Sequence, residues 1–434
     1  MPAKITRLTD PYTGDVCIRM QHDSGLEIRV MEMPGFSTAY AEFGVRFGAM
    51  HRQFRNGDAV MTLPAGTAHY MEHKLFEKAD GDVSGKFSAL GAADNAFTDY
   101  DRTVYHFHTQ RNFGEALALL LEFVQTPYFT QESVDRERSI IAQELSEALD
   151  DPADQVICGL LEGMYRDFPL HPHILGTTDS LNEITPELLH LAHSMFYHPE
   201  NMVLCCAGNV QAEQVLAIAD RMIVPRNNPR AVAGFPLEPP LPAKKRVSRH
   251  MAVGKTMFAI GFKSPPASGM ERLRNSLLTS LTADLLIGPA SPLYQKLLAD
   301  GLINDTFSTD CFAGEGWFSA LAEGESDEPE AVLDALLSEI RRMEQNGADA
   351  SLFEILKRSA YGDTVMSMNH PETACAAMLD SFIWDRISPF ARTEVLAQLT
   401  PDDVCSCLRE RFRQDSICLS VIEPNQPRKS KQKR

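Results

Sequence analysis

The chain has 434 residues, of which 44% are hydrophobic and 23% are charged, and it carries a formal net charge of −18 at pH 7. This length predicts more than one domain, and the composition is that of a globular protein. Nucleic acid binding requires a basic surface that neutralises phosphates, so the acidic balance argues against nucleic acid as a partner.

Targeting and membrane signals are not evident in the sequence. The N-terminal region has no basic segment followed by an apolar core, and no run of about 20 apolar residues could span a membrane. The nine cysteines are scattered and form no C-x-x-C pair. We interpret them as reduced, mostly buried thiols, which predicts a cytoplasmic protein and argues against a redox or iron protein.

The first predicted elements lead to a motif with metal-binding chemistry. Alternating apolar residues predict strands over 25–30 and 38–50, and a helix is predicted over 66–78. This helix contains the run His69-Tyr70-Met71-Glu72-His73. Helical spacing places both histidines and Glu72 on one face. Hydrolytic zinc chemistry needs such a set, because two imidazoles can bind the metal while a carboxylate acts as acid and base beside its water.

A later helix, predicted over 132–149, could complete this site. It follows a predicted strand over 103–108 and an amphipathic helix over 113–124. Glu137 and Glu144 lie two turns apart on it and point to the same side. In an ordinary helix both would be surface charges, but catalytic zinc needs a third protein ligand from another element. A buried strand over 201–208 and a helix over 212–222 follow.

Residues 65–78, 91–105 and 137–144 together resemble the pitrilysin/insulinase (inverzincin) family of zinc metallopeptidases, which includes the mitochondrial processing peptidases. The family pattern is an H-x-x-E-H helix, an N-A-x-T strand and a Glu on a later helix. The resemblance implies one Zn²⁺ per chain, held by His69, His73 and Glu144. It also implies Glu72 as the catalytic general base and Glu137 as a second acid that helps to orient the site.

The same resemblance assigns a substrate-binding strand. In the family, the N-A-x-T strand takes up the substrate backbone as an extra β-strand of the sheet. The matching residues here are Asn95, Ala96, Phe97 and Thr98. An ordinary turn followed by a strand would show the same pattern, so this assignment depends on the resemblance.

A proline-rich linker over 225–245 divides the chain, and a similar order of elements follows it. The second part predicts strands over 257–262, 317–322 and 417–422, and helices over 270–286, 293–299, 328–345 and 351–368. We therefore expect an α+β fold with two similar α/β halves, a zinc-binding one over 1–224 and another over 246–424, and a basic tail over 425–434. In the family, each half has an antiparallel sheet with helices packed on one side.

The second half departs from the family pattern. Active members often carry an Arg and, seven residues later, a Tyr that help to bind the substrate carbonyl across from the zinc. The matching positions are Leu298 and Asn304, with one residue fewer between them. Long members also enclose the substrate between two double units, whereas this chain has one. Its resemblance to short, bacterial, processing-peptidase-like members therefore predicts a homodimer or a heterodimer with a motif-less homologue.

Two functions are compatible with these patterns. The first is a zinc-dependent metalloendopeptidase that hydrolyses peptides or unfolded polypeptide segments, with a zinc-activated water and Glu72 as general base. The alternative is a catalytically weak or inactive binding or assembly subunit of a peptidase-like complex. The intact set of His69, Glu72, His73 and Glu144 favours the first function, and the missing Arg/Tyr pair favours the alternative.

Overall fold

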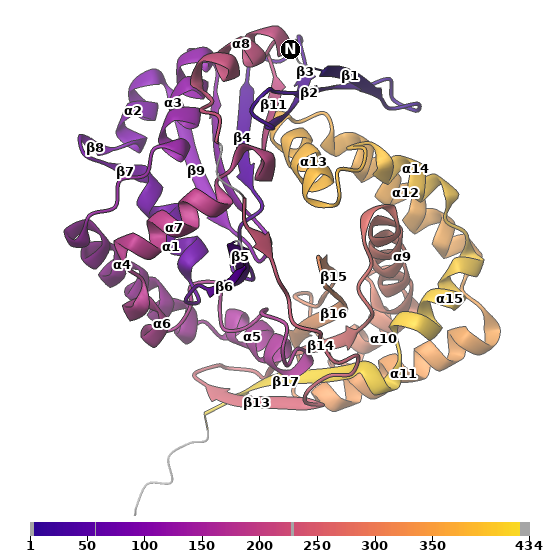
Figure 1. The fold of residues 1–434 in the computed structure, drawn as a ribbon. Helices are drawn as coiled ribbons and strands as arrows, with labels where there is room; N and C mark the ends of the chain where they lie inside the picture. The colour runs from indigo at the N-terminus through magenta and orange to yellow at the C-terminus, as the bar shows by residue number, and fades with distance from the viewer. Residues whose placement is uncertain (1–3, 57, 227–229, 426–434) are drawn as a thin grey trace, which may run out of the picture.

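The computed structural model describes residues 4–56, 58–226 and 230–425. The N-terminal elements, in indigo to magenta, lie on one side of the molecule, and most of the C-terminal elements, in orange to yellow, lie on the other (Figure 1). Each side is built around one large sheet, which confirms the predicted α+β fold with two similar halves. Residues 426–434 of the predicted basic tail lie outside the described residues.

The first sheet has seven strands, and only the pair β3 and β11 is parallel among its neighbouring strands. Its spatial order is β1 (Lys4–Thr9), β2 (Val16–Gln21), β3 (Glu27–Glu32), β11 (Met202–Gly208), β4 (Ala39–Val45), β10 (Thr103–Thr109) and β9 (Ala92–Thr98). The strand predicted over 38–50 ends earlier, at Val45. The chain turns at Gly48, where a Cβ atom would lie 2.4 Å from the carbonyl oxygen of Asp99.

The second sheet repeats this plan with five strands. Its order is β13 (Arg246–Met251), β17 (Ile417–Pro424), β14 (Met257–Lys263), β16 (Trp317–Glu325) and β15 (Ser308–Gly314). The pair β13 and β17 is parallel, and the other neighbours are antiparallel. Thus each sheet is antiparallel apart from one parallel pair. Smaller sheets join β12 (Val232–Ala233), β5 (Gln53–Asn56) and β6 (Ala59–Thr62), and β7 (Glu77–Lys78) with β8 (Gly81–Asp82).

Each half packs its own helices into one apolar core with its sheet. The helices of the first half are α1 (Thr67–Phe76), α2 (Ser84–Leu90), α3 (Phe113–Gln125), α4 (Gln131–Asp150), α6 (Thr178–Glu183), α7 (Pro186–Phe196) and α8 (Ala212–Met222). Those of the second half are α9 (Gly269–Ile287), α10 (Pro292–Ala299), α11 (Pro329–Asn346), α12 (Ala350–Ser367), α14 (Ala391–Gln398) and α15 (Pro401–Arg411).

Two further helices are exchanged between the halves. Helix α13 (Pro371–Ile383) packs on β11 and β4 of the first sheet, and α5 (Pro152–Met164) packs on β17 and β14 of the second. Glycines on the strands allow this close approach, because a Cβ atom at Gly44 or Gly261 would lie 2.5 Å from a side chain of the exchanged helix. One helix of the other half thereby packs on the opposite face of each sheet, over its central strands.

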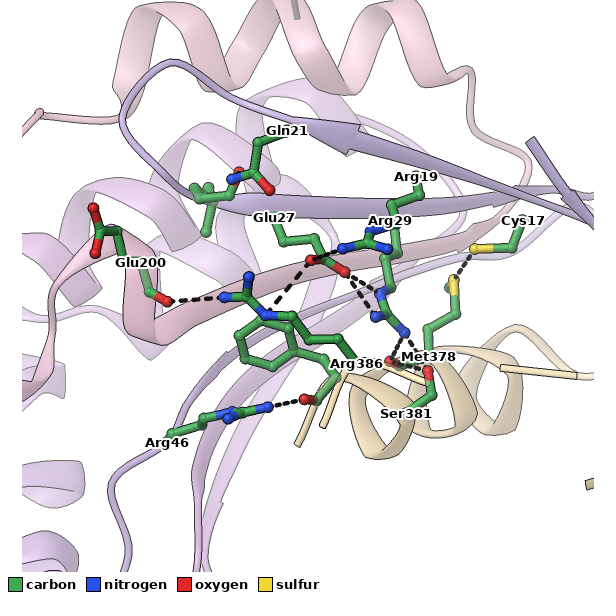
Figure 2. Close-up of polar contacts among 12 residues, drawn as sticks. Cys17, Arg19, Gln21, Glu27, Arg29, Arg46, Glu200, Met378, Ser381 and Arg386 are labelled. Atoms are coloured by element: carbon green, nitrogen blue, oxygen red, sulfur yellow. Dashed lines mark hydrogen bonds and ion pairs between the residues drawn. The ribbon is translucent and has the colours of Figure 1, made fainter. Parts of the chain in front are cut away.

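A buried polar cluster fixes α13 to the first sheet (Figure 2). Arg29 on β3 is fully buried and pairs with Glu27, whose carboxylate also accepts a hydrogen bond from Arg19 at 2.9 Å. The Arg29 guanidinium also donates to the carbonyl oxygen of Met378 at 2.9 Å and to the hydroxyl of Ser381, both on α13. This cluster therefore joins residues that are about 350 positions apart in the sequence.

The proline-rich stretch between the halves is also held in place. The Glu238 carboxylate accepts hydrogen bonds from the backbone N–H groups of Arg166, Asp167 and Phe168, and it pairs with Lys263 at 2.6 Å. Residues 227–229 of this stretch are outside the described part of the chain. Among the described residues, no helix combines the length and the apolar character that a membrane span requires.

Candidate metal centre and active site

The motif helix α1 presents one apolar face and one polar face. Tyr70, Met71 and Leu75 are buried in the core of the first half, which turns the histidines toward the opposite side. The helix begins after Gly66, whose φ of 85° lies in the left-handed region. A Cβ atom there would also lie 2.5 Å from the carbonyl oxygen of Leu175. Both the left-handed backbone and this close approach therefore favour glycine at position 66.

Helix α4 is placed beside α1 by its N-terminus and by its apolar residues. Thr130 and Ser133 form a reciprocal capping box at its start. Ile141 and Leu145 are buried in the same core as α1, and the hydroxyl of Tyr70 on α1 donates to the carbonyl oxygen of Val134. These contacts bring the carboxylates of α4 to the histidines of α1.

The structure brings together the three residues predicted as metal ligands. Ligand atoms of His69, His73 and Glu144 all lie within 4.8 Å of one another. The Glu144 Oε2 atom lies 3.9 Å from Nε2 of His69 and 3.6 Å from Nε2 of His73. Tetrahedral Zn²⁺ would separate such N and O atoms by about 3.4 Å, given bonds of about 2.0–2.1 Å. The donor set and its spacing therefore fit zinc after a small inward movement.

Glu137 fixes the orientation of one histidine. The Nδ1 atom of His73 lies 2.9 Å from Oε1 of Glu137, and a proton on Nδ1 leaves Nε2 free to bind a metal. Burial alone would lower the pKa of His73, but the hydrogen bond to Glu137 and the charge of Glu144 outweigh it and raise that pKa. Burial, with a smaller contribution from His73, lowers the pKa of His69 to about 3, so His69 is neutral as a metal ligand must be.

Glu72 occupies a different position from the other acids. It is 8% exposed, and its Oε2 atom accepts a hydrogen bond of 2.7 Å from the hydroxyl of Thr98 on β9. Burial raises the pKa of Glu72, and this hydrogen bond and His73 oppose the shift. A carboxylate with a raised pKa accepts a proton more readily near neutral pH, which is the property a general base needs.

The predicted substrate-binding strand is an edge strand of the first sheet. Among the described residues, β9 pairs with β10 alone and ends the strand order. Asn95 and Phe97 are exposed, Ala96 is half-buried, and Thr98 contacts Glu72. The open edge of this strand is thus next to the carboxylate of α1, in an arrangement that can accept a further strand.

A cavity of about 820 Å³ adjoins this strand and α1. Glu72, His73, Glu137 and Asn95 line it together with residues to which the sequence analysis assigned no role, among them Lys78, Tyr128 and Arg136. Burial lowers the pKa of Lys78 to about 8. These three residues were missed because no motif position falls on them. Lys78 on β7, Arg136 on α4 and Tyr128 just before α4 reach the site because these segments fold beside α1.

The second half adds no equivalent of the Arg/Tyr pair at the matched positions. Leu298 is 38% exposed on α10. Asn304 follows α10 and donates to the carboxylate of Glu325 at 2.8 Å. Neither side chain has the guanidinium or phenol that binds a substrate carbonyl in the family pattern.

A two-half α+β fold with an H-x-x-E-H helix in its first half defines a protein of the inverzincin type. The sequence matches the insulinase family (Peptidase family M16) over residues 63–178 and the peptidase M16 inactive domain over residues 183–360. The uncharacterized zinc protease YmfH of Bacillus subtilis is 31% identical over 92% of this chain and 95% of its own length. The chain therefore belongs to the insulinase family, M16.

Solved structures agree with this assignment. An M16-like peptidase from Alicyclobacillus acidocaldarius is 29% identical and has a TM-score of 0.90, with 98% of this chain and 99% of that chain covered. A peptidase M16 inactive domain from Pseudomonas fluorescens has a TM-score of 0.79 at 15% identity, with 97% and 98% covered. At that lower identity the likeness concerns the fold alone.

Proposed function

We propose that this protein is a zinc-dependent metalloendopeptidase that hydrolyses peptides or unfolded polypeptide segments. The observation that carries the proposal is the convergence of His69, His73 and Glu144, with Glu72 beside them and hydrogen-bonded to the edge strand β9. The three converging residues would hold one Zn²⁺ ion. When bound, zinc would supply a Lewis acid that polarises a peptide carbonyl and lowers the pKa of a water molecule.

The protein's own groups divide the remaining tasks. Glu72 takes a proton from the attacking water and returns it to the leaving amine. The hydroxyl of Thr98 holds the Glu72 carboxylate toward the open edge of β9 through its 2.7 Å hydrogen bond. Glu137 acts through His73 as a positioning residue, because it fixes the ring that presents Nε2 to the metal.

The proposed substrate is an extended chain, since only an extended backbone can pair with a strand edge. Residues Asn95 to Thr98 would bind that backbone, and the adjoining cavity of about 820 Å³ would take substrate side chains. A folded protein presents few such segments, which favours peptides and unfolded regions. We place this activity in the cytoplasm, in keeping with nine free cysteines.

The working form in this proposal contains two chains, either two identical copies or this chain with a motif-less homologue. A single chain has one metal motif and one pair of halves, and its second half lacks the Arg/Tyr pair at Leu298 and Asn304. A partner would close the site from outside and could provide the missing contacts to the substrate.

The alternative is a catalytically weak or inactive subunit that binds or assembles a peptidase-like complex. The specific observation in its favour is the pair at the matched positions: Leu298 has no hydrogen-bond donor, and the amide of Asn304 already donates to Glu325 at 2.8 Å.

A matched set of Glu→Gln substitutions separates metal binding from hydrolysis. The parent should hold about one zinc per chain and cleave unfolded peptides. Glu144→Gln should lose most of the zinc, Glu137→Gln should weaken zinc binding by about 10–100-fold, and Glu72→Gln should keep zinc and fold but lose cleavage. Metal analysis and a peptide-cleavage assay measure both properties.

Three results would count against the proposal. Full zinc retention in Glu144→Gln would remove this residue from the ligand set. Cleavage by Glu72→Gln at the parent rate would exclude Glu72 as the base. A zinc-loaded parent that cleaves no peptide, alone or with candidate partner chains, would favour the binding-subunit alternative.

A further inference from the structure

A second group of side chains with metal-binding chemistry lies on α5 and the loop that follows it. Asp154 and Cys158 are four residues apart and therefore share one face of α5. His173, from the loop before α6, meets them there. Ligand atoms of the three residues lie within 4.8 Å of one another, as those of His69, His73 and Glu144 do. We call this group the α5 cluster.

The spacing in the α5 cluster is close to that of bound zinc. Nε2 of His173 lies 3.1 Å from Oδ2 of Asp154, and Sγ of Cys158 lies 3.9 Å from the same oxygen. With Zn–N and Zn–O bonds of about 2.0–2.2 Å and a Zn–S bond of about 2.3 Å, tetrahedral ligands would be separated by about 3.4 Å for N and O and about 3.6 Å for S and O. These two separations thus depart from zinc geometry by a few tenths of an ångström, and the atoms of Cys158 and His173 lie within 4.8 Å of each other.

The surroundings of the α5 cluster leave room for a cation and a water molecule. Cys158 and His173 line a cavity of about 350 Å³. The basic residue of this cavity, Arg249, is paired with Glu162 at 2.9 Å and donates to the side chain of Gln155, so its charge is already matched. A thiolate, a carboxylate and a neutral imidazole would balance the charge of a divalent cation, and a water molecule could be its fourth ligand.

From this geometry we infer that Asp154, Cys158 and His173 form a second site for a divalent cation of the zinc class, separate from the proposed catalytic centre. The site contains a cysteine sulfur, which would bind a cation as the thiolate, whereas the catalytic set contains only imidazole and carboxylate groups. Soft thiolate ligands select zinc over magnesium or calcium. The assignment is independent of peptide hydrolysis and would stand if the protein were a non-catalytic subunit.

This second site binds its cation more weakly than the catalytic set does. Nδ1 of His173 accepts a hydrogen bond of 3.2 Å from the backbone N–H of Leu175, so the ring carries its proton on Nε2, which faces Asp154. A metal on Nε2 requires that proton to leave and the Leu175 contact to break. By contrast, His73 already donates from Nδ1 to Glu137 and needs no such change.

A cation in the α5 cluster would join two segments that support the catalytic ligands. Helix α5 follows directly after α4, which carries Glu144. The His173 loop packs against the start of α1, where a Cβ atom at Gly176 would lie 2.5 Å from the carbonyl oxygen of Ala65. The cation therefore would tie the end of α4 to the beginning of the helix that carries His69 and His73.

Cobalt(II) provides a direct test, because a thiolate ligand gives it a near-ultraviolet charge-transfer band that imidazole and carboxylate ligands do not give. The full-length protein, as purified, is titrated with Co²⁺ and then with excess Zn²⁺. We expect one added equivalent of cobalt per chain with the thiolate band, and loss of the band on adding zinc. Cys158→Ser should lose both the band and the added equivalent.

Two further variants make the result specific. Cys405→Ser removes another half-buried cysteine and should leave the band unchanged. Glu144→Gln disrupts the proposed catalytic ligand set and should also keep the band, so failure of the catalytic proposal would not affect this test. A saturating titration without a thiolate band, a band that survives Cys158→Ser in folded protein, or a band that zinc does not displace would overturn the inference.

Discussion

At the scale of single residues, the three glutamates of the site have different tasks because they make different contacts. Glu144 faces both Nε2 atoms, Glu137 faces only Nδ1 of His73, and Glu72 is held by Thr98. The sequence predicted which acids converge because helical spacing and the family resemblance are both local patterns. It could not predict that Thr98 contacts Glu72, since that pair depends on the packing of β9 against α1.

The α5 cluster likewise could be predicted from the sequence only in part. Asp154 and Cys158 have the i, i+4 spacing that often presents two ligands together, and this was the available signal. His173 lies on a loop 15 residues after Cys158, without a fixed spacing that a sequence pattern could detect. Only the tertiary structure adds the third ligand.

A buried acid in the first sheet predicts a pH effect on stability. Burial raises the pKa of Glu42 from 4.5 to about 8, with Asp380 adding to the shift and Arg102 opposing it. The folded state therefore binds a proton that the unfolded state releases. The resulting stabilisation is fully present below pH 4.5 and is lost as the pH rises through 8, at up to about 1.4 kcal/mol per pH unit.

Glu42→Gln should remove this part of the pH dependence, because an amide has no proton to lose in this range. Chemical denaturation of parent and variant between pH 5 and 8 measures the difference, with the other titrating groups common to both. The variant should gain stability relative to the parent as the pH rises. Equal slopes of unfolding free energy against pH would show that Glu42 does not carry a raised pKa.

At the scale of elements, the sequence predicted the bounds of the long helices more accurately than it predicted the contacts between the halves. The helix predicted over 132–149 is α4, Gln131–Asp150, and the helix predicted over 270–286 is α9, Gly269–Ile287. The exchange of α5 and α13 was not predicted. Its partners are remote strands, and no local pattern records which sheet a short apolar helix will cover.

The cluster around Arg29 should make the exchange of α13 energetically important. Arg29→Ala removes the hydrogen bonds to α13 and the main partner of the buried Glu27. Breaking a buried ion pair from one side costs about 3–5 kcal/mol, and the remaining contact of Glu27 with Arg19 favours the lower end. Chemical denaturation measures this loss, and limited proteolysis shows whether α13 detaches.

Arg7→Ala is the matched control, because Arg7 is an exposed arginine on the neighbouring hairpin strand β1. It should change the unfolding free energy by no more than about 0.5 kcal/mol. If Arg29→Ala is equally mild, the cluster contributes little to the docking of α13, and the apolar contacts of that helix with β4 and β11 must hold it.

At the scale of the whole molecule, the fold gives one set of candidate catalytic residues and one open strand edge per chain. Each half packs one helix on the other's sheet, so each chain is a single interlocked unit with α5 and α13 as the exchanged parts. The edge of β9 lacks a further strand among the described residues. A substrate strand added there would have no further strand of the described residues on its outer side.

We therefore expect the active species to contain two chains, and we expect activity to fall on dilution below the dissociation constant of that pair. Cleavage should be confined to peptides and unfolded segments, because a space closed by the second chain would exclude a folded protein by size. Sedimentation at micromolar concentration, combined with specific activity measured over a dilution series, tests both statements. If activity requires a motif-less homologue, adding that chain should restore it. A strictly monomeric species with constant specific activity would show that one chain is sufficient. A partner chain would then not be needed to replace the Arg/Tyr pair that is missing at Leu298 and Asn304.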